Sequence, residues 1–237
     1  MVLYLSRMAL NPRSREARRD VADCYELHRT VMAMFPKSSD SAEGSPRALY
    51  RLEAEGRHAI APSVTIQSGV EPDWDRLPAG YLLGVGARPE SKRIDQLLSH
   101  LDRYPALAFL LIANPTRKLR ITTSGVDGLK PMRVEIRDDQ TLMDWLRRKG
   151  REGGFEPLEV RAAPSAGVPI YEVMATSGKR AGVQRRKGAH NRLTFGAVRF
   201  EGRLRVTDSA AFTQTVTQGV GSAKAFGFGL LSVAPGR

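Results

Sequence analysis

Glycine is concentrated near the C-terminal end of this chain, in the segment from Gln218 to Val233. Four glycines fall between positions 219 and 229, with one lysine and two phenylalanines among them, and an apolar, strand-like stretch follows. Glycine tolerates positive φ and lets a backbone approach a ligand or another segment closely. Successive N–H groups in such a loop can also form an anion-binding concavity. The segment therefore predicts either an anion-binding loop or a glycine-rich connection into a last strand.

The common nucleotide-binding motifs do not fit this loop. Lys224 stands where a dinucleotide fingerprint needs its third glycine. No Ser or Thr follows that lysine, as it would in the phosphate-binding loop of a nucleotide hydrolase. These departures argue against a nucleotide-dependent enzyme.

Charge is distributed unevenly along the 237 residues. Residues 1–90 hold 12 basic and 12 acidic side chains, so residues 91–237 carry the whole formal excess of +12. An excess of this size on one half of a chain predicts a polyanion, above all nucleic acid, as its partner. A solvated basic surface without a ligand is the alternative interpretation.

Metal-ligand and targeting patterns are missing from the sequence. The four histidines are far apart and have no cysteine partners, and the single Cys24 excludes an internal disulfide. We therefore expect chemistry that uses no metal and no other cofactor, in a reducing cytoplasm. No apolar run reaches the roughly eighteen residues of a membrane span, and the N-terminus lacks the layout of a signal peptide. No membrane partner is expected.

The order of elements in the first half matches a ferredoxin-like domain, strand–helix–strand–strand–short helix–strand. We place this domain at residues 1–88. Residues 13–20 are predicted to be a charged loop. Strands are predicted at 2–10, 48–53, 60–67 and 81–85. The helix is predicted at 24–34 and the short helical turn at 71–78.

The helix predicted over 24–34 contains the second focus of the sequence. Asp23 stands before it as an N-cap, with Glu26 three residues later in a capping-box pattern. Tyr25 and His28 are three apart, so they share one edge of the helix and place a phenol beside an imidazole. From the pattern alone, a surface histidine on an amphipathic helix is the simpler interpretation.

The second half, 106–237, repeats the plan with additions. Asp138 and Asp208 are predicted to cap helices that end near Lys149 and Thr217. A kink is predicted at 199–203, between two parts of one strand. Extended segments are predicted at 107–113, 119–122, 155–161, 169–176, 194–198 and 204–206, before the last strand that follows the glycines.

A loop from Ser177 to Gly188 lies between two of these extended segments. Residues 179–205 contain nine Lys or Arg and a single acid, Glu201. A basic β-hairpin can lie along a phosphate backbone. Because side chains read the deep major groove of continuous duplex RNA poorly, such a hairpin is better placed at a short stem or its end. A mobile, solvated loop is the alternative.

Four segments, spread over nearly the whole chain, match a known pattern in order and spacing. They are Met1–Arg7, Arg18–Thr30, Ala113–Lys118 and Gly219–Pro235. In these segments the chain resembles the CasE family, the CRISPR repeat-processing endoribonucleases of the type I-E Cascade complex. The resemblance implies an α+β fold of two tandem ferredoxin-like (RAMP, RRM-like) domains with a basic β-hairpin and a C-terminal glycine-rich loop.

The resemblance also implies a reaction. Proteins of this family cut the repeat stem-loop of CRISPR precursor transcripts at the 3′ base of the stem, without a metal. The 2′-hydroxyl beside the scissile phosphate attacks in line and leaves a 2′,3′-cyclic phosphate and a 5′-hydroxyl. The cut makes mature guide RNA, and the protein stays bound as a subunit of Cascade, so repeat RNA and other Cascade subunits are the expected partners.

Site residues follow from the same resemblance. Tyr25 and His28 match the Tyr-x-x-His motif of the family, so they are the predicted catalytic pair, with acid and base left open. Relatives often have proline at the position of Cys24; its loss here can loosen the helix start but removes no catalytic group. The predicted RNA contacts are Arg29, Arg117, Lys118, Arg180, Arg185, Arg186, Lys187, Gly219, Gly221, Lys224, Gly227 and Gly229.

A non-catalytic RNA-binding subunit of a CRISPR effector complex, with the same RAMP-type build, is the alternative hypothesis. It would use the same basic hairpin and glycine loop but would not need the pair of Tyr25 and His28. The glycine loop is predicted to face the cleft between the two domains, with residues 219–229 turned toward the N-terminal helix.

Overall fold

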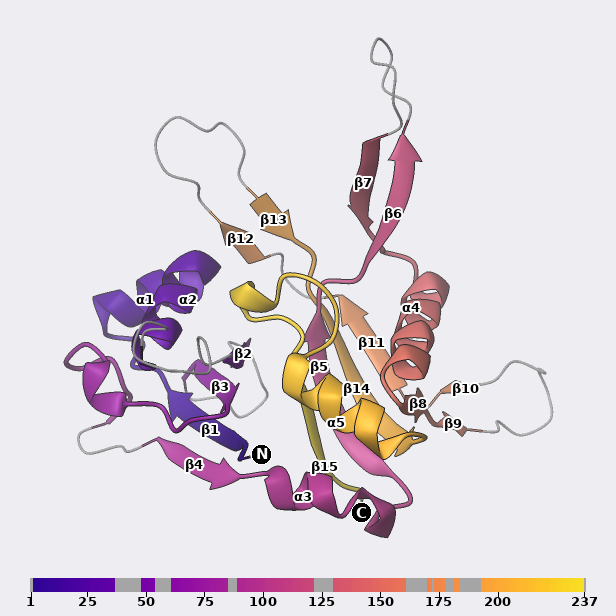
Figure 1. Cartoon of the computed structure of the whole chain (residues 1–237). Helices are drawn as coiled ribbons and strands as arrows, with labels where there is room; N and C mark the ends of the chain where they lie inside the picture. The colour runs from indigo at the N-terminus through magenta and orange to yellow at the C-terminus, as the bar shows by residue number, and fades with distance from the viewer. Residues whose placement is uncertain are drawn as a thin grey trace.

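Two antiparallel sheets, one in each half of the chain, form the framework of the molecule (Figure 1). Helices pack against both sheets, and each half has its own apolar core. The computed structural model describes residues 2–36, 48–53, 61–84, 89–121, 130–160, 170–171, 173–177, 181–183 and 193–236.

The first sheet has the strand order β2-β3-β1-β4. Its strands are β1 (Tyr4–Ala9), β2 (Leu49–Glu53), β3 (Ser63–Ser68) and β4 (Glu90–Arg93). Strand β1 is central, with Tyr4 opposite Ser68 on one side and Arg93 on the other. The first and third strands lie in the middle of the sheet, and helical segments connect the first strand to the second and the third to the fourth. This is the split βαβ arrangement of a ferredoxin-like domain.

Two helices, rather than one, follow the first strand. They are α1 (Arg15–Ala22) and α2 (Cys24–Ala33). The prediction of a charged loop at 13–20 was wrong, because Ser14 caps α1 by accepting a hydrogen bond from the Ala17 N–H. Ala17 and Asp20 are buried while the arginines face water. The many arginines hid this narrow buried face in the sequence.

The fourth strand was also predicted at the wrong place, at 81–85. Leu82 makes only an isolated bridge to Leu10 in that stretch, and Tyr81 is buried as a side chain of the core. Instead, the strand β4 forms at the sheet edge from the sequence Glu-Ser-Lys-Arg. Charged edge strands resist pairing with other chains, but they lack the apolar alternation that marks a strand in a sequence.

The second sheet repeats the same order, β11-β14-β5-β15, with β8 also paired to β14. Its strands are β5 (Leu107–Ala113), β8 (Phe155–Pro157), β11 (Val173–Ser177), β14 (Val198–Val206) and β15 (Leu231–Pro235). Its helices α4 (Asp139–Glu152) and α5 (Ser209–Gln218) begin at the predicted caps, Asp138 and Asp208. The predicted α+β fold of two tandem ferredoxin-like domains is confirmed, while the domain limits 1–88 and 106–237 stay a prediction.

Strand β14 runs without interruption, so the kink predicted at 199–203 is wrong. The charged residues Arg199 and Glu201 pair with each other at 2.7 Å on one face, and Phe200 and Leu204 are buried on the other. Two-residue alternation of this kind builds a regular strand. The dense charge gave the impression of a break.

Hairpins are added to the second sheet. The pairs are β6 (Thr116–Ile121) with β7 (Lys130–Glu135), β9 (Glu159–Val160) with β10 (Ile170–Tyr171), and β12 (Ala181–Val183) with β13 (Leu193–Phe195). The hairpins β6–β7 and β12–β13 project from the same end of the molecule (Figure 1). Strand β7 was missed from the sequence. The shorter elements are η2 (Trp74–Arg76), α3 (Asp95–Ser99), η3 (Leu101–Arg103) and η4 (Lys224–Phe226).

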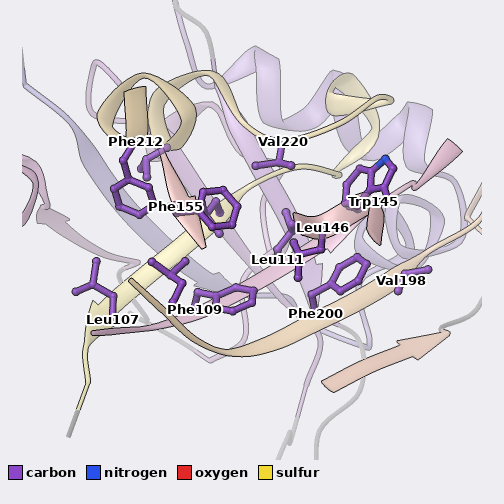
Figure 2. Close-up of a cluster of buried hydrophobic side chains, with 14 of the residues drawn as sticks. Leu107, Phe109, Leu111, Trp145, Leu146, Phe155, Val198, Phe200, Phe212 and Val220 are labelled. Carbon is purple, nitrogen blue, oxygen red and sulfur yellow. The ribbon is translucent and has the colours of Figure 1, made fainter. Parts of the chain in front are cut away.

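Aromatic rings fill the core between the second sheet and its helices (Figure 2). Trp145 of α4 stacks on Phe200 of β14 with 5.8 Å between ring centroids, and Phe155 meets Phe212 edge-on at 5.9 Å. Val220 points into this cluster from the glycine loop. The start of the loop is therefore anchored by burial. Within the described residues, no helix is both long and apolar enough to cross a membrane.

Tyr81→Phe tests the buried polar contact that holds α1 on the first core. The Tyr81 hydroxyl donates to Asp20 Oδ2 at 2.8 Å, and Asp20 is fully buried. An unsatisfied buried oxygen costs about 1–3 kcal/mol, so we expect a lower urea midpoint at an unchanged m-value. Tyr104→Phe is the control, since that hydroxyl makes no hydrogen bond within the described part of the chain. Equal midpoints for the two variants would contradict this account.

Candidate functional site

The start of α2 is fixed by its cap. Asp23 Oδ1 accepts a hydrogen bond from the Tyr25 N–H at 2.8 Å, as the sequence predicted. Glu26 contacts Arg29 at 3.2 Å and Arg19 at 3.5 Å rather than closing a capping box. The cap places Tyr25 and His28 on one edge of the helix, with Tyr25 exposed and His28 half-buried.

His28 lies between two aromatic rings that come from opposite ends of the chain. Its imidazole is stacked with Tyr50 of β2, at 6.2 Å between ring centroids, and lies 6.4 Å from Phe226 of the glycine loop. The Nδ1 atom of His28 is buried and makes no hydrogen bond to any described residue. Burial lowers the pKa of His28 below its ordinary value of 6.5. The imidazole is therefore neutral at neutral pH.

The glycine loop meets the first sheet through Tyr50. The Tyr50 hydroxyl donates to the Ala225 carbonyl oxygen at 2.9 Å, and the Tyr50 side chain is fully buried. Element η4 lies against α2 and β2 (Figure 1). The prediction that the loop faces the N-terminal helix is confirmed. Tyr50 itself was missed, because an alternating strand pattern does not say which buried ring contacts a distant loop.

Two glycines of the loop are required by close approach. A Cβ on Gly229 would lie 2.5 Å from the Val220 carbonyl oxygen, and one on Gly227 would lie 3.1 Å from Tyr50 Cε2. Both residues have positive φ, +85° and +84°. The Val220 N–H donates to the Gly229 carbonyl at 2.8 Å, and the Gly229 N–H donates to Ile112 of β5 at the same distance. The loop is thus closed on itself and attached to the second sheet.

The hairpin β12–β13 also contacts the glycine loop, on the side where His28 lies. Phe195 of β13 stacks on Phe226 at 5.0 Å and lies 6.0 Å from Phe228. Strand β12 lies beside α2. The base of the predicted basic hairpin therefore stands next to His28. Its cations Arg180, Arg185, Arg186 and Lys187 lie outside the described residues.

The remaining predicted RNA contacts fall into three groups. Arg29 is exposed on α2, beside the catalytic candidates. Arg117, Lys118 and Lys224 line a groove of about 660 Å³ on the far side of the glycine loop, together with Gly219 and Gly221. Gly227 and Gly229 are buried residues of the loop itself, and their positive φ angles and close neighbours determine its conformation. Three cations of the groove were missed from the sequence: Arg133, Arg148 and Lys149.

Comparison with known proteins decides the family. The family described as CRISPR associated protein matches residues 3–235. The CRISPR-associated endoribonuclease Cse3 of Thermus thermophilus is 36% identical over 233 residues, which cover 98% of this chain and 100% of that protein. The chain belongs to the CasE/Cse3 family of CRISPR associated proteins.

Further relatives support this assignment. The CRISPR system Cascade subunit CasE of Escherichia coli (strain K12) is 27% identical over 241 residues, 98% of this chain and 100% of that protein. A structure of CRISPR endoribonuclease Cse3 bound to 19 nt RNA matches with a TM-score of 0.77 and 35% identity, over 98% of this chain and 100% of that chain. Thermus thermophilus Cse3 bound to an RNA representing a pre-cleavage complex matches with a TM-score of 0.72 and 34% identity, over 99% and 100%. The CasE resemblance is confirmed.

A pH titration tests the environment of His28. We expect its imidazole to titrate below 6.5, because burial disfavours the cation. The folded pKa is lower than the unfolded one, so the unfolded chain binds more protons between the two values. Stability should therefore fall as pH decreases through that window, and His28→Gln should remove this part of the dependence. NMR titration and urea unfolding measure both effects. A His28 pKa above 6.5 in the free protein would contradict the assigned burial.

Proposed function

We propose that this chain is a metal-independent endoribonuclease that cleaves the repeat stem-loop of CRISPR precursor transcripts and then keeps the product as a subunit of Cascade. One observation carries the proposal. The half-buried imidazole of His28 meets the glycine loop beside an exposed phenol, in a chain that is 36% identical to the endoribonuclease Cse3 over its whole length. Fold alone would also suit a protein that only binds RNA.

The reaction needs a base for the 2′-hydroxyl, an acid for the leaving 5′-oxygen and stabilisation of charge on the phosphate. The neutral His28 imidazole can take the 2′-hydroxyl proton. Tyr25, on the same edge of α2, can donate from its exposed hydroxyl to the leaving oxygen. Hence no metal or other cofactor is required by this scheme.

Charge on the phosphate would be met from two sides. Arg29 is exposed one residue beyond His28, and Lys224 begins η4, the short helix that lies against α2. Backbone N–H groups of a loop with several positive-φ residues can add fixed dipoles. These groups act on the reacting phosphate, whereas the hairpin β12–β13 would hold the stem close to His28.

The proposal also includes the setting. The repeat RNA is the substrate. The other Cascade subunits are the protein partners, since the relative named CasE is a Cascade subunit. We expect the reaction to take place in the cytoplasm, where transcripts are made and thiols such as Cys24 stay reduced.

His28→Ala is the direct test. Loss of a general base typically slows a reaction by about a hundred- to ten-thousand-fold, whereas a neutral imidazole contributes little to phosphate binding. We expect single-turnover cleavage of a cognate repeat to be slowed in this range while the binding titration stays close to wild type. His100→Ala, at a partly exposed histidine that directly follows α3, is the matched control.

Two outcomes would contradict the proposal. Cleavage by His28→Ala at the wild-type rate would mean that α2 does not carry the active site, and a non-catalytic RNA-binding subunit would then be the better hypothesis. Loss of wild-type cleavage in excess chelator would remove the metal-independent mechanism.

A further inference from the structure

The groove of about 660 Å³ on the far side of the glycine loop is separate from the edge of α2 that carries Tyr25 and His28. Its walls are the hairpin β6–β7, one face of α4 and the first half of the glycine loop. In Figure 1, α4 and the hairpin β6–β7 lie on the side of the glycine loop opposite to α1 and α2. Lys224 belongs to both places, because it lines the groove and begins the short helix that contacts α2.

One face of α4 supplies the groove with charge. Trp145, Arg148, Lys149 and Glu152 are three or four residues apart, so they share that face. Arg148 and Lys149 both pair with Glu152, at 3.1 Å and 2.5 Å. A single carboxylate thus serves two cations, and positive charge remains on this wall.

The hairpin wall has an arrangement that is unfavourable without an anion. Lys118 stands directly opposite Arg133 in the antiparallel pair β6–β7, and both side chains are exposed. Like charges directly opposite each other destabilise a strand pair. No salt bridge to Lys118, Arg133 or Arg117 is present in the described part of the chain. A bound phosphate would relieve this repulsion.

The groove is built for phosphates rather than bases. Base stacking needs an exposed aromatic face, but the Trp145 ring that lines the groove is only 4% exposed and stacks on Phe200. The lining therefore offers six cations against the one acid, Glu152, and no free ring: Arg117, Lys118, Arg133, Arg148, Lys149 and Lys224. Binding of this kind follows the backbone and does not read sequence.

The position of the groove indicates which part of the RNA it binds. The hairpin β12–β13 and His28 lie on one side of the glycine loop, through Phe195 and Phe226, and the groove lies on the other. An RNA whose stem is held near His28 would pass over the loop as it leaves the stem. We propose that the groove binds the phosphates of the single-stranded RNA segment that flanks the stem, an inference that rests on the proposed function.

The test compares two triple variants of the full chain. Arg133→Gln, Arg148→Gln and Lys149→Gln remove three charges from the groove. Arg137→Gln, Arg147→Gln and Arg151→Gln remove three charges outside the groove lining, one from the segment between β7 and α4 and two from α4 itself. Each is titrated with two repeat RNAs, one with single-stranded flanks and one trimmed to the stem-loop. A 2′-deoxy nucleotide at the scissile position prevents cleavage of either RNA.

We expect the groove variant to bind the flanked RNA at least about tenfold more weakly than wild type, because the loss of even one contact to a charged group costs about this much. Its salt slope for that RNA should flatten by up to about two, near 0.7 per lost single-strand contact. Affinity for the trimmed RNA should be unchanged, and the control variant should match wild type with both RNAs.

Other results would overturn the inference. Equal weakening with both RNAs would assign the groove to the stem. No weakening with either would mean that RNA does not occupy the groove, and an acidic protein surface would be the better candidate. Both binding results are independent of cleavage, because the RNA is not cut. If the wild type failed to cleave a repeat RNA that keeps its 2′-hydroxyl, the proposed function would be wrong, but the binding result for the groove would still stand.

Discussion

The hydrogen bond from the Tyr50 hydroxyl to the Ala225 carbonyl, 2.9 Å long, is the contact on which the site depends. It connects a strand of the first sheet with the loop that leads into the last strand of the second. Because His28 stacks on the same Tyr50 ring, one buried side chain determines the place of both the imidazole and the loop. Glycine at 227 leaves the space for that ring. Tyr50 thus brings His28 and Phe226 close together, although no hydrogen bond joins these two side chains.

A second buried contact also connects the first sheet with the second. Arg51, next to Tyr50 in β2, is 4% exposed and donates to Ser232 Oγ of β15 at 2.9 Å. Burial lowers the pKa of Arg51. The carboxylate of Glu53, which pairs with the guanidinium at 2.7 Å, raises this pKa and so offsets part of that effect. A buried cation without that carboxylate would be costly. Adjacent residues of one strand therefore fix the end of the glycine loop and the strand after it.

Much of this could be predicted from the sequence, and the failures have physical causes. Caps such as Asp23 and Asp138 are local hydrogen bonds, so sequence spacing locates them. Helix α1 and strand β4 were missed because arginine-rich and edge segments carry little apolar pattern. The pairing of Lys118 with Arg133 and the role of Tyr50 depend on register and on contacts between distant segments. Such contacts are set by the whole fold.

The most direct test compares Tyr50→Phe with Tyr81→Phe in single-turnover cleavage, at a temperature where both variants are fully folded. Each variant removes the hydroxyl of a buried tyrosine. Tyr50→Phe loses the donation to Ala225 of the glycine loop at 2.9 Å and a longer contact with the Cys24 carbonyl at 3.5 Å, and Tyr81→Phe loses the donation to Asp20. If the Tyr50 contact positions the site, Tyr50→Phe cleaves more slowly and shifts the His28 titration, and Tyr81→Phe cleaves at the wild-type rate. Equal cleavage rates and unchanged His28 titrations in the two variants would contradict this central role.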